Sequence, residues 1–483
     1  MSPLARQATR QRAAKDILMQ VVVRIANLAL GVVVTALVVR TLGQAGYGQW
    51  STLFIVIALV GYFANFGMEG VALREAARRP ELEHEWIGTV IAARLIMLVP
   101  VMLVSLVVLV LVEQSHQMLI AGLILIAVMP FGGVSALSIL FRLRVDNRVP
   151  MIVLTLRSVL WGIAVVFISA DGGGMIALAI AMAATNTVGS IVQALAAMRI
   201  VPRWPRPNRK HLRELARVGL PIGISGVLVI AYARIDQVIV YVIAGSKQAG
   251  LYGAVYNVLD QSHFVPVSIM TTLAPVLAAS WPADPARLLR SARLTGELLA
   301  VASFGALAFA IVAAEPLVVA IFGAEFAPAA SVLPVLGAAF VLICFGYLNG
   351  QLMLVLGLQR RMLRISVIAL VVNLAGNLIL VPLFGYTGAA WMTLVTEMVV
   401  FGFAFTMVLR ELELPRPRLG RLGRTALAAA LLAAVLGALR IGPDAPLAVL
   451  IATACVCYPT FLIALRAFGA DDVRVLLGRG TPA

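Results

Sequence analysis

The sequence predicts an all-α polytopic membrane protein. Of its 483 residues, 61% are hydrophobic and only 12% are charged, whereas soluble domains carry about 25% charged residues. The mean hydropathy is +1.00. Apolar runs of about 20 residues recur along the whole chain, and each is long enough to cross the ~30 Å hydrocarbon core as a helix. This pattern excludes a soluble enzyme or a soluble binding module.

Counting these runs predicts about 14 transmembrane helices. The eighth run is overlong and contains Pro266 and Pro275, which predicts a kink or a break within it. The thirteenth is short. The predicted spans are 17–39, 48–68, 88–112, 118–141, 150–170, 174–198, 219–244, 250–280, 297–320, 332–356, 362–382, 386–409, 425–439 and 446–465.

The basic residues between the spans predict the orientation. One set of alternate loops, with the two termini, holds 31 of the 38 Lys and Arg residues; the other set holds three, and four lie inside spans. Positive charge is retained in the cytoplasm. We therefore expect a multi-pass protein of the bacterial cytoplasmic membrane with both termini in the cytoplasm. The net charge of +16 is explained by these loops and does not indicate nucleic-acid binding.

A weak internal repeat predicts two pseudo-symmetric lobes of six helices. The segment Gln44–Gly48 follows the first span, and the similar segment Gln248–Gly253 follows the seventh. Each copy of six spans then has the same orientation, as in parallel repeats. The expected domains are an N-lobe (1–198), a basic cytoplasmic linker (199–218) that could lie on anionic headgroups, a C-lobe (219–410), and a C-terminal part with two more helices (411–483).

Arg234 and Asp236 lie near the middle of the predicted span 219–244. A charge at that depth costs at least ~2.5 kcal/mol on insertion scales and faces protein or water rather than lipid. Because Arg234 is about 15 residues into the span, its side chain is too deep to reach the headgroups easily. We expect Arg234 to bind an anionic substrate.

Further basic and polar residues extend this prediction to the first half. Gln20, Arg24 and Asn27 share one face of the first span. Arg94 and Arg157 lie at similar depth in spans three and five. Together these residues predict a cationic cavity, since a guanidinium donates two parallel hydrogen bonds to a phosphate. The alternative for Arg24, Arg94 and Arg157 is that their long side chains extend to the headgroups.

The intramembrane acidic residues are candidates for ion coupling. They are Asp236, Asp260 and Glu397, and His263 shares a helix face with Asp260. Carboxylates and imidazoles in a membrane interior serve as proton or cation sites. The alternative is that these carboxylates pair with the arginines and neutralise them. Asn373 and Asn377 share a face, which predicts hydrogen bonds between helices.

No motif indicates catalysis, a cofactor or a metal site. The chain lacks the phosphate-binding G-x-x-x-x-G-K-[ST] motif. Cys344, Cys455 and Cys457 lie within apolar spans and give no disulfide framework. The short outer loops leave no room for a catalytic domain. We therefore expect a transporter rather than an enzyme.

The chain resembles bacterial polysaccharide (O-antigen) flippases of the Wzx type, in the superfamily that includes multidrug and toxin extrusion (MATE) transporters and lipid II flippases. The resemblance covers nearly the whole chain. Its most specific parts are short segments around the predicted span ends: Arg40-Thr41-Leu42-Gly43 with Tyr47-Gly48, Asn65-Phe66-Gly67 with Leu73-Arg74-Glu75, Asp236, and Gly250-Leu251-Tyr252 with Ala254.

This resemblance implies two six-helix lobes around a cavity that opens alternately to each side. It implies transport of an undecaprenyl-diphosphate-linked, anionic oligosaccharide to the outer leaflet for surface polysaccharide such as lipopolysaccharide or exopolysaccharide. A cation (H⁺ or Na⁺) or the membrane potential would drive it, and membrane lipids and other polysaccharide-assembly proteins would be partners. A cation-coupled multidrug exporter of the same fold is the alternative, and a membrane-embedded polysaccharide-synthesis enzyme is less favoured.

Overall fold

The protein is described by a computed structural model over residues 3–65, 67–113, 115–144, 148–200, 205–412, 420–441 and 445–467. For residues 3–25, 132–135, 221, 222 and 225 the structure describes the backbone alone. Within these ranges the secondary structure is helical, with no β-strand. The predicted all-α fold is therefore confirmed.

The helices of the described ranges account for each predicted span. Twelve are long and apolar enough to cross a membrane, and the shorter apolar helix His116–Phe131 corresponds to the fourth span. The first two spans lie in one helix whose backbone is interrupted at Gly43 (φ 66°, ψ −176°). Gly245 (φ 88°, ψ 169°) similarly separates the seventh and eighth spans. Glycine adopts positive φ without steric cost, so the chain reverses at both places without a long loop.

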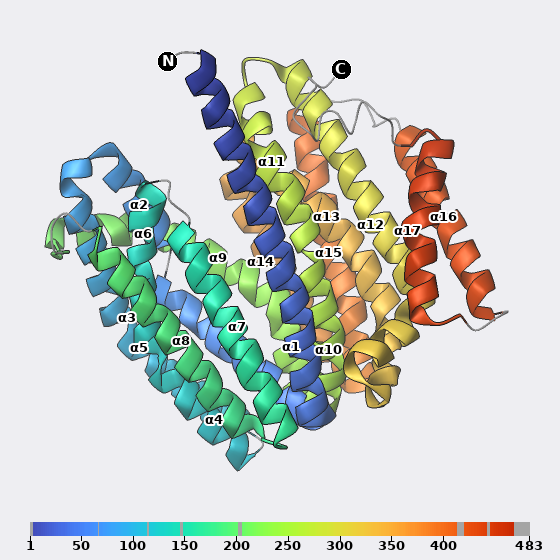
Figure 1. The fold of residues 1–483 in the computed structure, drawn as a ribbon, viewed down its shortest axis with the longest axis horizontal. Helices are drawn as coiled ribbons and strands as arrows, with labels where there is room; N and C mark the ends of the chain where they lie inside the picture. Colours follow the sequence, from blue (N-terminus) through green and yellow to red (C-terminus); the bar gives the residue numbers. More distant parts are fainter. Residues whose placement is uncertain are drawn as a thin grey trace. The chain divides into compact units, whose positions relative to one another are not determined.

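The chain divides into two compact units, Met1–Val227 and Leu228–Ala483. The predicted lobe and linker boundaries stay predictions. In unit 1, α1 packs against α3 and α7, and α7 packs beside α8 (Figure 1). Its elements are α1 (Pro3–Asn65), α2 (Met68–Arg78), η1 (Pro80–Leu82), α3 (Glu83–Val112), α4 (His116–Ala127), α5 (Met129–Gly133), η2 (Val134–Leu137), α6 (Ser138–Leu143), α7 (Arg148–Ala170), α8 (Met175–Met198) and the first part of α9 (Arg209–Ala244).

The fourth span differs from the single helix 118–141 that the sequence predicts. It is divided into α4, α5, η2 and α6. The segment Pro130-Phe131-Gly132-Gly133 lies at the division. Proline removes a backbone donor and glycine weakens a helix, so this segment forms only the short helix α5 and the regular helix is interrupted on both sides of it.

In unit 2, α13 packs against α12 and α15, and α14 packs against α15 (Figure 1). The elements after α9 are α10 (Ser246–Ser262), α11 (Phe264–Ser280), α12 (Pro285–Phe322), η3 (Ala324–Val332), α13 (Leu333–Val355), α14 (Gln359–Phe384), α15 (Tyr386–Glu411), α16 (Gly420–Ile441) and α17 (Leu447–Ala464). The predicted break in span eight is confirmed: it lies at His263, three residues before Pro266, while Pro275 is inside α11.

The C-terminal helix pair α16–α17 packs on α12. Helix α16 is longer than the predicted span 425–439 because it continues through Arg421, which lies 2.8 Å from Glu297 of α12. Tyr458 of α17 donates a hydrogen bond to the carbonyl oxygen of Val301, at 2.7 Å. Its ring fills the space beside Gly305, where an added Cβ would lie 2.5 Å from a ring carbon.

Candidate functional site

Arg234 of α9 and Asp260 of α10 form an ion pair in unit 2. Arg234 Nη1 lies 2.7 Å from Asp260 Oδ2, and the side chains are 33% and 23% exposed. The guanidinium also lies 5.2 Å from the ring centroid of Tyr256. The two helices are joined at Gly245, which lies 11 residues after Arg234 and 15 before Asp260. At 1.5 Å per residue, Arg234 and Asp260 therefore differ by about 6 Å in their distance from the turn at Gly245, and an arginine side chain is long enough to span this difference.

Asp236 forms a separate centre, because positions two apart on a helix point in different directions. Its side chain is almost fully buried. Tyr252 of α10 donates to Asp236 Oδ2 at 2.6 Å, and Thr393 of α15 donates to the same oxygen at 3.1 Å. The backbone N–H of Gln237 donates to Oδ1 at 2.8 Å. The carboxylate therefore links α9, α10 and α15 through hydrogen bonds.

The other ion-coupling candidates form no ion pair with the described side chains, although His263 interacts electrostatically with Asp260 and Arg234. The ring of His263 stacks against Phe340 of α13, with centroids 6.3 Å apart, and its buried Nε2 has no hydrogen-bond partner among the described residues. Glu397 of α15 is partly buried; no ion pair joins it to the described side chains, but it interacts electrostatically with the Tyr232 hydroxyl. The structure thus pairs Asp260 with Arg234 and places His263 within electrostatic reach of this pair, whereas Glu397 is paired with neither.

Asn373 of α14 forms a hydrogen bond between helices, as predicted, whereas the hydrogen bond of Asn377 stays within α14 and holds Asn373 in place. Asn373 Nδ2 donates to Thr396 Oγ1 of α15 at 3.3 Å, and Asn377 Nδ2 donates to Asn373 Oδ1 at 3.1 Å. These bonds support a structural role in joining α14 to α15.

In unit 1, Arg94 of α3 is buried and paired. Its Nη2 lies 2.6 Å from Glu69 Oε1 of α2 and 2.6 Å from Asn65 Oδ1 at the end of α1. The side chain is only 7% exposed. This pairing favours a structural role, in which Arg94 joins three helices, over contact with a substrate.

Arg157 of α7 has a different environment. It is exposed, and its Nη2 donates a hydrogen bond to the amide oxygen of Asn186 on α8. Its aliphatic part crosses α8 at Gly189, where an added Cβ would lie 2.3 Å from Arg157 Cδ. No carboxylate pairs with it among the described residues. Among the intramembrane arginines whose side chains are described, Arg157 is therefore the one whose charge no acid neutralises.

The direction of the Arg157 side chain argues against extension toward the headgroups. Arg157 and Gly189 each lie nine residues from the predicted cytoplasmic end of their helix, which is about 14 Å along the axis. Asn186 lies one turn farther from that end. The guanidinium thus reaches deeper into the membrane rather than back toward the cytoplasm.

The remaining candidates lie on α1. Asn27 Nδ2 donates to Thr155 Oγ1 of α7 at 3.2 Å, which places it two residues along α7 from Arg157. The side chains of Gln20 and Arg24 lie outside the described residues, so their role stays a prediction.

The sequence patterns above do not single out Asn186 and Gly189 on α8, nor do they show that Tyr252 is the partner of Asp236. The signal was present: Asn186, Gly189 and Gln193 recur at steps of three and four along an apolar helix, which places them on one face. The tyrosine could not be found in this way, because it comes from another helix.

The family model described as "Polysaccharide biosynthesis protein" matches residues 13–281, more than half of the 483 residues. The chain belongs to the polysaccharide biosynthesis protein family. No curated protein matches the chain.

The fold of this polysaccharide biosynthesis protein is shared with transporters of known structure. Lipid II flippase MurJ in an inward closed conformation aligns with a TM-score of 0.75 and 14% identity, over 93% of this chain and 99% of that chain. An inward-facing multidrug resistance MATE family transporter of the MOP superfamily has a TM-score of 0.65 and 18% identity, over 80% and 94% of the two chains. The MATE multidrug transporter DinF-BH, in complex with R6G, has a TM-score of 0.62 and 18% identity, over 82% and 97%. This member of the family is thus a multi-pass membrane protein that shares its fold with these transporters.

Proposed function

We propose that this protein is a flippase that moves a lipid-linked, anionic oligosaccharide, such as an undecaprenyl-diphosphate oligosaccharide, across the bacterial cytoplasmic membrane for surface polysaccharide synthesis. It acts by alternating access, with both termini in the cytoplasm, and catalyses no covalent step. The family supports a role in polysaccharide synthesis, and the fold supports transport.

The observation that carries the proposal is the uncompensated charge of Arg157. An arginine inside a membrane that is neither paired with an acid nor extended to the headgroups requires water or an anion beside it. Asn186 occupies one N–H group and leaves the other donors of the planar guanidinium free to bind phosphate oxygens. A cation exporter would instead favour an uncompensated carboxylate at this place.

Arg234 and Asp260 suggest how transport is coupled to an ion. Because the pair is partly exposed, a phosphate can compete with Asp260 for the guanidinium. Release of Asp260 would leave a carboxylate inside the membrane without a counter-charge, and binding of H⁺ or Na⁺ would restore neutrality. Asp236, His263 and Glu397 remain further candidates for this ion.

The test is substitution of Arg157 by Ala and by Lys in the producing bacterium, with surface polysaccharide and membrane protein level both measured. We expect Arg157→Ala to abolish the polysaccharide and Arg157→Lys to retain part of it. Lysine keeps the positive charge but lacks the planar guanidinium that donates two parallel hydrogen bonds. Arg199→Ala, which removes an exposed arginine at the end of α8, is the matched control. Normal polysaccharide in Arg157→Ala would refute the proposal, as would drug sensitivity with intact polysaccharide in a deletion strain.

A further inference from the structure

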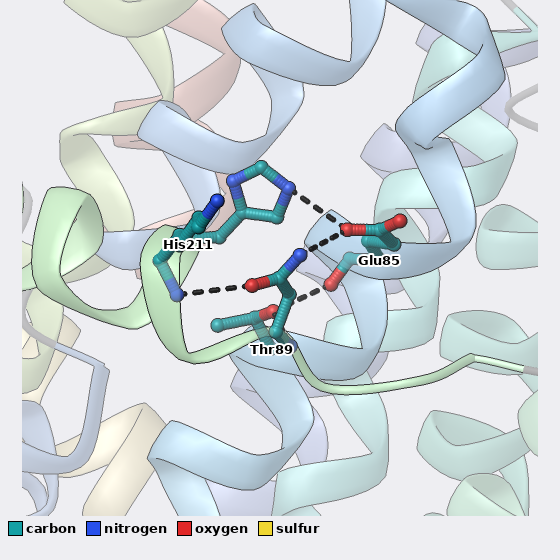
Figure 2. Close-up of polar contacts among 5 residues, drawn as sticks. Glu85, Thr89 and His211 are labelled. Carbon is teal, nitrogen blue, oxygen red and sulfur yellow. Dashed lines mark hydrogen bonds and ion pairs between the residues drawn. The ribbon is translucent and has the colours of Figure 1, made fainter.

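The first turns of α9 extend beyond the predicted span 219–244 and are fixed to unit 1. Asn208 is the N-cap of α9, since its Oδ1 accepts from the backbone N–H of Lys210 at 3.0 Å. Its Nδ2 donates to Glu85 Oε2 of α3 at 2.5 Å, and its backbone N–H donates to Thr89 Oγ1 at 3.0 Å. Figure 2 shows His211 beside the same carboxylate, with Nε2 3.1 Å from Glu85 Oε2. We call these contacts the α3–α9 clip.

Backbone and apolar contacts reinforce the clip. The backbone N–H of Arg206 donates to the carbonyl oxygen of His84 at 3.2 Å. The chain approaches so closely that a Cβ on Gly88 would lie 2.4 Å from the Arg206 nitrogen. The ring of His211 stacks on Trp86, with centroids 4.1 Å apart, and Leu215 is buried in the apolar core of unit 1. These contacts therefore fix which face of the first turns of α9 lies against α3.

This orientation leaves a basic stripe on the opposite side of the helix. His211, Leu215 and Val218 face the core of unit 1. The stripe consists of residues that are exposed and that form no ion pair with the described residues: Arg209, Lys210, Arg213 and Arg217. Arg209, Arg213 and Arg217 recur at steps of four and Lys210 lies three residues before Arg213, so the four residues share an arc of about 100° on the side away from the buried face.

We propose that the basic stripe binds the phosphate groups of anionic phospholipids in the cytoplasmic leaflet. This inference does not depend on the transported substrate. The α3–α9 clip gives the stripe its orientation, and the stripe in turn fixes the height of unit 1 in the membrane.

Two features favour a lipid surface over an acidic protein. First, the stripe continues directly into a membrane span: Arg217 lies 27 residues before Ala244, the end of α9, or about 40 Å along the axis. That length is close to the ~40–45 Å that a bilayer measures with its headgroups. Second, Leu212 and Leu220 are exposed along one edge of the stripe. Basic residues beside exposed leucines are typical of helices at the membrane interface.

The test measures retention of phosphatidylglycerol and phosphatidylcholine by the full-length, detergent-purified protein, using native mass spectrometry. The stripe variant is R209Q/K210Q/R213Q/R217Q. Each cation near the surface contributes about fivefold to anionic-lipid binding, so we expect the preference for phosphatidylglycerol to fall by more than about tenfold. R209K/R213K/R217K keeps the charge and should keep the preference.

The matched control is R287Q/R290Q/R360Q/R364Q, which removes four exposed arginines from other predicted cytoplasmic segments. We expect a clearly smaller fall than in the stripe variant, because these four charges are divided between two separate segments and are not gathered on one helix face. An equal loss in both variants would overturn the proposal, because net charge alone would then explain the binding. An unchanged preference in the stripe variant would also overturn it. Loss of surface polysaccharide by that variant, with lipid preference intact, would assign the stripe to an acidic protein instead.

Discussion

The substitution Gly189→Ala moves Arg157 without removing its charge. The added Cβ would lie 2.3 Å from Arg157 Cδ and 2.4 Å from Cγ, whereas ordinary van der Waals contacts are about 3.5–4.0 Å. The side chain must therefore move by about 1 Å or more, since overlap of this size is not tolerated. A shift of this size breaks the hydrogen bond to Asn186. Because the arginine is flexible and exposed, the protein should still fold.

The magnitude follows from the hydrogen bond that is lost. A hydrogen bond to a charged group contributes about 1.5–3 kcal/mol, which corresponds to a change of about tenfold to a hundredfold in an equilibrium constant. We expect Gly189→Ala to lower surface polysaccharide by at least about tenfold at an unchanged membrane level. Asn186→Ala should have a similar effect, and the double variant should be no worse than either single variant, because both act through Arg157.

Gly402→Ala is the matched control for this experiment. Gly402 lies in α15, and an added Cβ has no neighbour within 4 Å, so polysaccharide should stay at the wild-type level. Wild-type polysaccharide in Gly189→Ala would refute the reasoning. Strictly multiplicative losses for Gly189→Ala and Asn186→Ala would show that the two residues act independently and that Arg157 is not their common target.

Three further substitutions test the contacts of the site and the linker by thermal unfolding of the purified protein. Asp260→Ala should lower the free energy of unfolding by ~1–3 kcal/mol, which is less than the loss expected for a fully buried pair. Adding Arg234→Ala should restore part of this stability. If the two losses were additive, the ion pair would be contradicted. Tyr252→Phe removes a donor to buried Asp236 and should cost about 1–3 kcal/mol; an unchanged midpoint would argue that the carboxylate is protonated. Gly88→Ala should displace the linker from α3 and lower the free energy of unfolding by ~1–3 kcal/mol. A protease-cleavage site introduced into the linker should then be cut more readily than in the wild-type protein. Resistance equal to that of the wild type would show that the linker stays docked.

The hydrophobic pattern was sufficient to predict the helical fold and the number of spans. An apolar run of about 20 residues has few alternatives to a transmembrane helix, and so the eighth span, which follows Gly245 and contains Pro266, agrees with the structure. The fourth span was predicted less well. Its composition is apolar throughout, and composition alone does not show that Pro130 and its neighbouring glycines divide the helix.

The candidate site was predicted in part, because depth in the membrane can be read from a sequence but pairing cannot. Arg94, Arg157 and Arg234 all lie within apolar spans, yet Arg94 and Arg234 meet carboxylates of other helices, and Arg157 does not. Which acid reaches which arginine depends on how antiparallel helices align along their axes. That alignment is set by the turns, such as the one at Gly245, and by close contacts at small residues such as Gly189.

The contact between Tyr458 and Gly305 fixes the helix pair α16–α17 to α12, so that the pair moves with α12. The Tyr458 ring occupies the space left by the missing side chain of Gly305, and its hydroxyl donates to the carbonyl oxygen of Val301. Together these contacts prevent α17 from sliding along α12 or rotating about it. A spectroscopic label on the outer surface of α17, for example at exposed Val456, would consequently report the displacement of α12 during the proposed transport cycle. Such a label would leave the polar residues of the proposed site untouched.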